Sequence, residues 1–190
     1  MLDAGEYVLG PENPGHDSDQ LTVRTSRTGV GARVGHDLVI SAAQWSARAT
    51  VPPSGPGEAT IAATIQTGSL AITEAIGGVK PMTRSDRRTT EKNMRGVLKP
   101  SAFPTATFAS TSVVVDGTTL RVEGDLALLG VSKPVALTGS IDESGLFEVT
   151  AEVSQSRWGI TPFSAFLGAL RLADEVTVAI RGKLELDGTR

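Results

Sequence analysis

A chain of 190 residues is most simply one domain with a sizeable core. Its formal net charge of −3 and sequence pI of about 5.4 argue against a protein that binds nucleic acid or an anionic membrane. Because the chain contains no cysteine, disulfides, thiolate catalysis and cysteine-type zinc sites are excluded.

The N-terminal stretch has neither a basic region nor a long apolar run, so we expect no signal peptide and a cytoplasmic location. The longest uncharged apolar stretch, 158–170, is too short to cross a bilayer, so no transmembrane segment is expected. No linker or repeat divides the chain, which predicts a single domain over residues 1–190.

In the first half of the chain, apolar and polar residues alternate with period two, the pattern of strands with one buried face. It predicts extended segments over 6–10, 20–25, 36–51 and 59–67, separated by loops rich in glycine and proline. In the last of these, alternate residues from Ala59 to Ile65 share a face. Its small alanines would leave volume inside a barrel.

The segment 70–82 is interrupted by two glycines and a proline, so a loop is expected there. A helix is predicted over 83–98, because Thr83 and Asp86 have the spacing of a capping box. Pro100 follows shortly after and would end it. Few of its side chains are apolar, so we expect this helix to lie on the surface.

The most regular alternation runs from Thr119 to Ile141. Gly130, in the middle, can adopt the left-handed conformation of a tight turn, so a β-hairpin is predicted. Further strands are predicted over 105–115, 145–154 and 173–186. With about eight strands and one clear helix, we expect an all-β sandwich or closed antiparallel barrel, between which periodicity alone does not decide.

Residues 161–172, TPFSAFLGALRL, predict a short apolar helix before the last strand. Thr161 can cap it, and large apolar residues from Phe163 to Leu170 follow at i, i+3, i+4 and i+7. Such a helix would either line or cover a cavity, or plug the end of a barrel that holds no ligand. The pattern leaves both interpretations open.

Four short motifs occur in a characteristic order: FPTATF at 103–108, LRVEGDLALLGVSKPVAL at 120–137, SRWGI at 156–160 and ADEVTVAI at 173–180. Together they resemble the YceI-like family of bacterial polyisoprenoid-binding proteins. The resemblance implies a lipocalin-like antiparallel β-barrel whose apolar interior holds a long isoprenoid, such as a polyprenyl pyrophosphate or an isoprenoid quinone. It implies binding or carriage without chemistry and no cofactor besides such a lipid. It is also compatible with a homodimer, for which the sequence itself gives no sign.

The chain departs from the family pattern at 21–25, where LTVRT lacks the histidine of the usual Phe-x-Val-Arg-His; a histidine occurs instead at position 36. Following the resemblance and the apolar pattern, we expect nine residues to line the cavity: Phe103, Phe108, Leu126, Leu128, Leu137, Trp158, Phe163, Phe166 and Leu167. The head group of the ligand would meet Arg24, His36 and Arg157, since arginine offers a bidentate fork to phosphates.

No catalytic or metal-binding motif is recognised, because the two histidines lack a metal-site spacing and no Gly-x-Ser-x-Gly is present. We therefore expect a binding protein without catalytic residues or a metal site. Two alternatives stay open. One is an enzyme on the same barrel that acts on an apolar small molecule and needs a titratable residue in its cavity. The other is a non-binding structural or interaction module with a filled interior.

Overall fold

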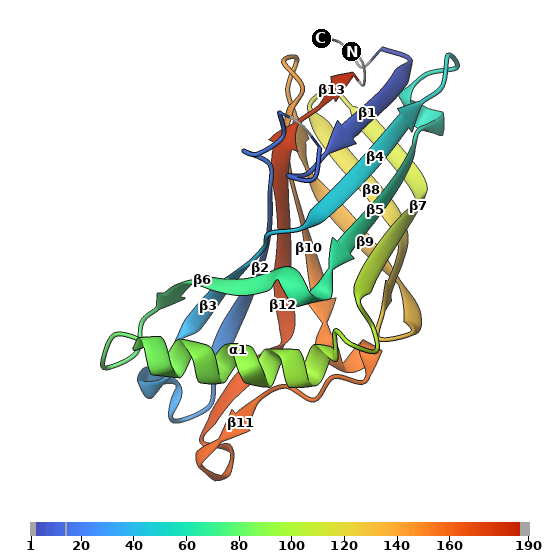
Figure 1. Cartoon of the computed structure of the whole chain (residues 1–190). Coiled ribbons are helices and arrows are strands. Elements are labelled where there is room, and N and C mark those ends of the chain that lie inside the picture. Colours follow the sequence, from blue (N-terminus) through green and yellow to red (C-terminus); the bar gives the residue numbers. More distant parts are fainter. Residues whose placement is uncertain (1–2, 14, 187–190) are drawn as a thin grey trace.

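The structure, a computed structural model, describes residues 3–13 and 15–186. In this part of the chain, thirteen strands form one antiparallel sheet that curls into a barrel, with α1 (Arg84–Leu98) as its α-helix (Figure 1). The all-β barrel prediction is confirmed, although with thirteen strands rather than about eight. Within the same residues, no helix combines the length and the apolarity that crossing a membrane requires.

The strands of the first half are β1 (Gly5–Leu9), β2 (Gln20–Thr28), β3 (Asp37–Ala42), β4 (Trp45–Val51), β5 (Thr60–Gln66) and β6 (Leu70–Ile76). Those of the second half are β7 (Thr105–Asp116), β8 (Thr119–Leu128), β9 (Val131–Ile141), β10 (Leu146–Ser154), β11 (Ser164–Ala165), β12 (Leu170–Lys183) and β13 (Glu185–Leu186). Neighbours in the sheet follow the order β13-β1-β4-β5-β7-β8-β9-β10-β12-β2-β3-β6, and β11 pairs with β12.

The sheet closes on itself at one end of the molecule. β13 follows β12 after a single residue, Leu184, and pairs with β1, whose other edge pairs with β4. Tyr7, Ala49 and Val51 are buried there against Leu184 and Leu186. We call this the closed end; it lies at the top of Figure 1.

At the opposite end the sheet splits. The chain bends between β3 and β4, and again between β5 and β6, so that β3 and β6 pair with each other away from β7. No described strand fills the gap between β6 and β7, and α1 lies across it (Figure 1). None of the side chains of α1 is fully buried, and Met94 packs against the β3–β6 pair. We call this the open end. Its segments 29–36, 77–84 and 161–171, which include β11, the first residue of α1 and the first two residues of β12, are called the tip loops.

The local signals for α1 are confirmed. The Asp86 main-chain N–H donates to Thr83 Oγ1 over 3.1 Å, and the Thr83 N–H donates to Asp86 Oδ2 over 3.0 Å, which forms the capping box. Lys99 adopts a left-handed backbone (φ 48°) and ends the helix before Pro100.

The predicted hairpin is also present, as β8 and β9. The two strands pair from Thr119–Ser140 to Leu128–Val131. Leu129 and Gly130 form the turn with φ values of 53° and 77°, and positive φ at both central residues is what a two-residue turn needs to match the twist of its strands.

Two expectations are wrong. Residues 70–76 form strand β6 rather than a loop, since the two glycines and the proline only begin after Ile76. Residues 161–172 do not form a helix; β11 pairs with the start of β12 across a tight turn at 166–168. A helix this short is marginal without tertiary packing, and pairing with β12 satisfies the same backbone groups.

Candidate functional site

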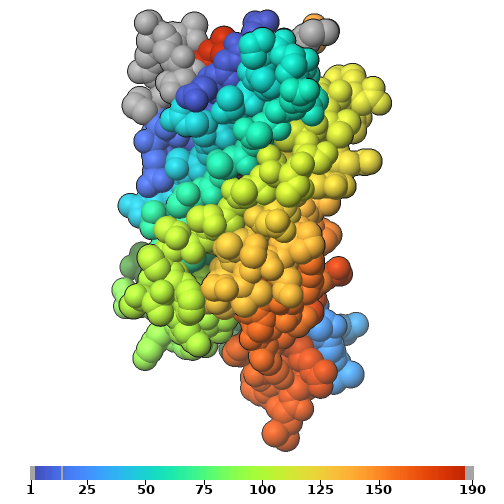
Figure 2. Space-filling model, turned by 90° about the vertical axis from the view of Figure 1, so that its right-hand side faces the viewer, coloured from blue at the N-terminus to red at the C-terminus, as the bar shows by residue number. Residues whose placement is uncertain are grey.

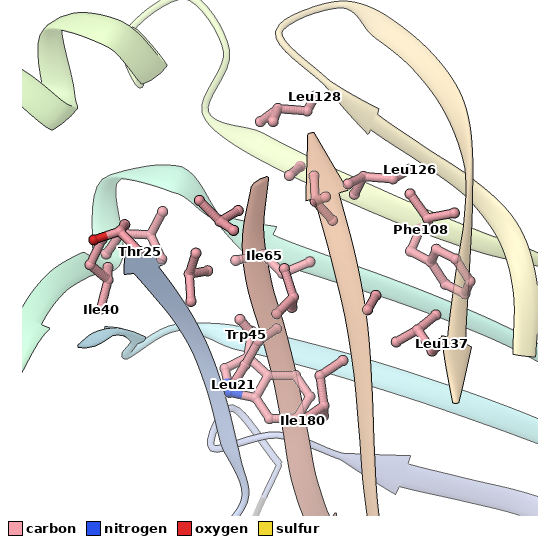
Figure 3. Close-up of a pocket in the computed structure, with 18 of the residues that line it drawn as sticks. Leu21, Thr25, Ile40, Trp45, Ile65, Phe108, Leu126, Leu128, Leu137 and Ile180 are labelled. Carbon is pink, nitrogen blue, oxygen red and sulfur yellow. The ribbon is translucent and has the colours of Figure 1, made fainter. Parts of the chain in front are cut away.

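The curled sheet encloses a cavity of about 870 Å³ (Figure 3). Inward-facing apolar side chains of β1 to β10 and β12 form its wall, and α1 with the tip loops surrounds its open end. Phe163 and Val79 belong to the wall and are nevertheless 48% and 70% exposed, which marks where the cavity meets solvent.

The interior is hollow because many inward-facing positions carry small side chains. On β5, Ala63 lies in register between Ala47 of β4 and Phe108 of β7, so only one of these three side chains is large. Val178 and Ile180 are only partly buried, although β10 and β2 flank them on both sides. A filled barrel would bury such central residues completely. The space inside is therefore a cavity rather than a packed core.

The titratable side chains in the described wall lie at its two ends. At the closed end, the hydroxyl of Tyr7 donates to the main-chain oxygen of Asp3 over 2.9 Å, and burial raises the pKa of Tyr7. At the open end, Nε2 of His36 lies 2.9 Å from the main-chain oxygen of Lys80. Asp86 lies there as well, and its hydrogen bonds with Thr83 hold the pKa of this carboxyl below its usual range.

Between the two ends the wall is largely apolar, and its hydroxyl groups are engaged by the main chain. Thr25 Oγ1 accepts the Leu38 N–H over 3.2 Å, and the Thr67 hydroxyl donates to the Phe103 oxygen over 2.7 Å. The middle of the cavity therefore offers a ligand apolar surface rather than free hydrogen-bonding groups.

Both tryptophans of the chain belong to the wall, with different polar environments. Trp158, 2% exposed, donates from Nε1 to the Leu126 oxygen over 3.2 Å. The guanidinium of Arg157 lies over its ring, with 5.2 Å between Cζ and the ring centroid. Trp45, 1% exposed, has no hydrogen-bond partner for Nε1 among the described residues. One indole is thus fixed by a bond and a cation, and the other by packing.

This contrast predicts unequal effects of the same substitution. We expect Trp158→Phe to lower the free energy of unfolding by about 2 kcal/mol, because it removes a hydrogen bond and weakens the stacking of Arg157. Trp45→Phe removes an N–H that is buried without a partner, which offsets the lost contacts, so a change within about 1 kcal/mol is expected. Urea unfolding followed by far-UV circular dichroism measures both. Equal losses in the two variants would contradict this account.

Helix α1 is attached to the free edge of β6 by two side chains one helical turn apart. The main-chain N–H of Ile72 donates to Glu91 Oε1 over 3.0 Å, and Arg87 Nη1 donates to the oxygen of the same residue. These side chains satisfy backbone groups that a neighbouring strand would otherwise pair. The helix therefore closes the gap in the barrel through side-chain hydrogen bonds, rather than through the main-chain hydrogen bonds that join neighbouring strands.

We expect Glu91→Ala to remove one of the two bonds that attach α1 to β6. The Ile72 amide loses its acceptor, so its protection against hydrogen exchange should fall about tenfold, the effect of removing one hydrogen bond to a charged group. Arg88→Ala, on an exposed neighbouring position of the same helix, is the control and should leave exchange unchanged. If Ile72 exchanges equally in both variants, Glu91 does not hold the helix in place.

The structure places six of the nine residues expected to line the cavity in its wall: Phe108, Leu126, Leu128, Leu137, Trp158 and Phe163. The remaining three lie outside it. Phe103 packs beside Gly130 in the β8–β9 turn. Phe166 and Leu167 project from the turn between β11 and β12, where they are 73% and 110% exposed.

The three head-group candidates do not come together. His36 belongs to the wall at the open end. Arg24 is exposed on β2, between two inward-facing residues, and so lies on the outer face of the sheet. Arg157 is exposed and donates from Nη2 to the Pro134 oxygen over 2.9 Å. These two arginines lie outside the cavity wall.

Part of the wall escaped the sequence-based selection. Trp45 begins a period-two run with Ala47, Ala49 and Val51, all of which face inward, and this alternation was the available signal. Met94 of α1 also belongs to the wall, but its inclusion depends on where the helix docks, which its own periodicity does not reveal.

Comparison with known proteins agrees with this architecture. A family model described as YceI-like domain matches residues 21–184. Curated relatives named Protein YceI, from Escherichia coli O157:H7 and Shigella flexneri, are 44% identical over 57 residues. This match covers 29% of the chain and 30% of each relative, so it spans less than a third of their length.

Solved structures share the fold at low sequence identity. Burkholderia cenocepacia BcnA has a TM-score of 0.66 at 14% identity, over 87% of this chain and 96% of that one. The YCEI protein of Campylobacter jejuni has a TM-score of 0.56 at 16% identity, over 78% of this chain and 85% of its own. With the family model spanning most of the barrel and the fold shared, the chain belongs to the YceI-like family.

Proposed function

We propose that this protein binds a long apolar ligand of the isoprenoid type, either an isoprenoid quinone or a polyprenyl pyrophosphate, with its tail inside the barrel. The observation that carries the proposal is the apolar cavity of about 870 Å³. Its volume lies in the upper part of the range of roughly 300–1,000 Å³ that is usual for ligand sites. A preformed cavity of this kind binds by removing apolar tail surface from water, at about 0.8 kcal/mol for each methylene group.

The shape of the cavity favours a chain-like ligand. Its wall extends from Tyr7 at the closed end to Phe163 at the open end, and so follows the length of the barrel. A flexible tail can enter such a space end first and lie along it. The six wall residues predicted from the sequence, from Phe108 to Phe163, would contact that tail.

The head group would lie at the open end. His36 and Lys80 belong to the wall there, and Arg33 and Arg171 lie on the adjacent tip loops. An imidazole and nearby cations suit a head group with acceptor oxygens, which both a quinone and a pyrophosphate possess. Arg24 and Arg157, on the outer face, would take no part.

We infer binding without chemical change. The titratable groups of the described wall lie at its ends, away from where the apolar tail would sit. Asp86, the carboxyl among them, has its pKa lowered by the helix cap, which makes it a poor general base. A tail-binding site does not need such groups.

Intrinsic fluorescence tests the proposal, because both tryptophans belong to the wall. Decylubiquinone titrated into delipidated protein is expected to quench both residues saturably, as read in the single-tryptophan variants Trp45→Phe and Trp158→Phe. Geranylgeranyl pyrophosphate should reverse the quenching by competition. Linear, non-saturable quenching in both variants would refute tail binding in this cavity.

A further inference from the structure

Large apolar side chains gather on the outside of the tip loops. Val30, Val79, Phe166 and Leu167 are 96%, 70%, 73% and 110% exposed. The loops form one unit, since the Gly31 N–H donates to the main-chain oxygen at position 169 over 2.8 Å and His36 contacts Lys80. Figure 2 shows two of these loops, blue and orange, protruding together beyond the barrel. Large exposed apolar side chains on adjoining loops are typical of an interaction surface.

The charge of the same loops differs from that of the whole chain. They contain Arg33, Lys80, Arg84 and Arg171, and no Asp or Glu. The tip loops therefore carry +4 by formal count, although Asp37 and Asp86 lie one and two residues beyond them, in a chain whose formal charge is −3. The negative net charge of the whole chain argues against an anionic partner, but it does not describe the local charge of the tip loops, which is positive.

The tip of the β11–β12 turn holds its apolar side chains outward in an unfavourable backbone conformation. Phe166 and Leu167 have φ values of 52° and 55°, in the left-handed region that costs energy for residues with large side chains. The side chain of Arg171 braces this turn by donating from Nε to the Gly168 oxygen over 2.9 Å. Asparagine would form the same turn more readily, so packing within the chain does not explain the phenylalanine and the leucine.

We propose that the open end docks on an anionic lipid bilayer, with Phe166, Leu167 and Val30 inserted among the acyl chains and the tip-loop cations at the phosphates. Aromatic and aliphatic side chains flanked by Lys and Arg are the composition of interfacial membrane anchors. Val79 and Phe163 are both exposed and part of the cavity wall, so docking turns the mouth of the cavity towards the bilayer. The docking proposal does not depend on the proposed ligand, because it is argued from the tip loops alone.

Sedimentation with vesicles tests the docking. The probes are vesicles of phosphatidylcholine alone and of phosphatidylcholine mixed equally with phosphatidylglycerol, both free of isoprenoids. The protein is expected to bind the anionic vesicles and to lose binding as salt rises. Phe166→Asn with Leu167→Asn should weaken binding at least about tenfold while keeping the turn, and Arg33→Gln about fivefold, the usual contribution of one cation near an anionic surface.

Leu146→Asn is the matched control, because Leu146 is 57% exposed and begins β10, where it pairs with Lys183 at the other end of β12. It should bind anionic vesicles as the unaltered protein does, and so should Ala63→Phe, which fills the cavity without touching the loops. The Phe166→Asn, Leu167→Asn variant should therefore lose docking, whereas Ala63→Phe should lose ligand binding. The proposal is overturned if the unaltered protein does not sediment with anionic vesicles. It is also overturned if light scattering shows instead a dimer that the Phe166→Asn, Leu167→Asn variant dissociates.

Discussion

Ala63→Phe is expected to lower the affinity for an isoprenoid ligand at least about tenfold. The new ring would point into the cavity between Ala47 and Phe108 and occupy space that the tail needs. Displacing only two methylene groups, each worth about 0.8 kcal/mol, already gives a factor of about ten. Because the ring enters open space, the free energy of unfolding should change by less than about 1 kcal/mol. Isothermal titration with a delipidated sample measures the affinity.

Ala62→Phe is the control for this experiment. Ala62 is the preceding residue of β5 and is exposed on the outer face of the barrel. The same ring is thus added one position away, on the other side of the sheet. Affinity should be unchanged in this variant. Equal affinities in the two variants would mean that the ligand does not occupy the cavity.

Asp19→Ala is expected to cause the largest loss of stability, about 3 kcal/mol, or a fall in Tm of about 6–12 °C. The side chain is 1% exposed and holds three groups together. Its carboxylate accepts the N–H of Gly10 over 2.9 Å and that of Lys183 over 3.3 Å, and Oδ2 lies 2.8 Å from Nδ1 of His16. Removing it leaves these donors unpaired and releases the segment after β1 from the end of β12.

Asp17→Ala provides the comparison, because Asp17 is exposed two residues earlier in the same loop. Its effect should stay within about 0.5 kcal/mol. Thermal unfolding followed by circular dichroism measures both variants. If the free energy of unfolding of Asp19→Ala changes as little as that of Asp17→Ala, the buried carboxylate does not stabilise the closed end.

The period-two pattern predicted much of the fold and of the cavity wall. On the β8–β9 hairpin, on β5 and on β10, the apolar residues of each alternation face inward, as the pattern indicates. The capping box at Thr83 and the turn at Gly130 could also be predicted from the sequence, because both depend on local geometry. The correct predictions of the fold and the cavity wall therefore came from sequence patterns that act within a few residues.

What the sequence did not reveal depends on distant contacts. Phe166 and Leu167 have helical spacing with Phe163, yet pairing between β11 and β12 places them on a turn outside the cavity. The split of the sheet at the open end follows from bends between β3 and β4 and between β5 and β6, for which the local sequence has no distinctive signal. The docking of α1 over that gap depends on the bonds to Ile72 and was likewise hidden.

Net charge does not reveal the basic tip loops for a related reason. The total of −3 is a sum over the chain, whereas a surface is made of the residues that the fold brings together. Arg33, Lys80 and Arg171 come from three separate segments, which are joined only in the fold, through the Gly31 bond to position 169 and the contact of His36 with Lys80.

The most direct test of the central claim is native mass spectrometry of the protein purified from its own host, followed by extraction and identification of the bound lipid. We predict an added mass that corresponds to one isoprenoid for each chain, which Ala63→Phe removes and Ala62→Phe retains. A protein that carries no lipid, or that carries the same lipid in both variants, would contradict a ligand-binding role for the barrel.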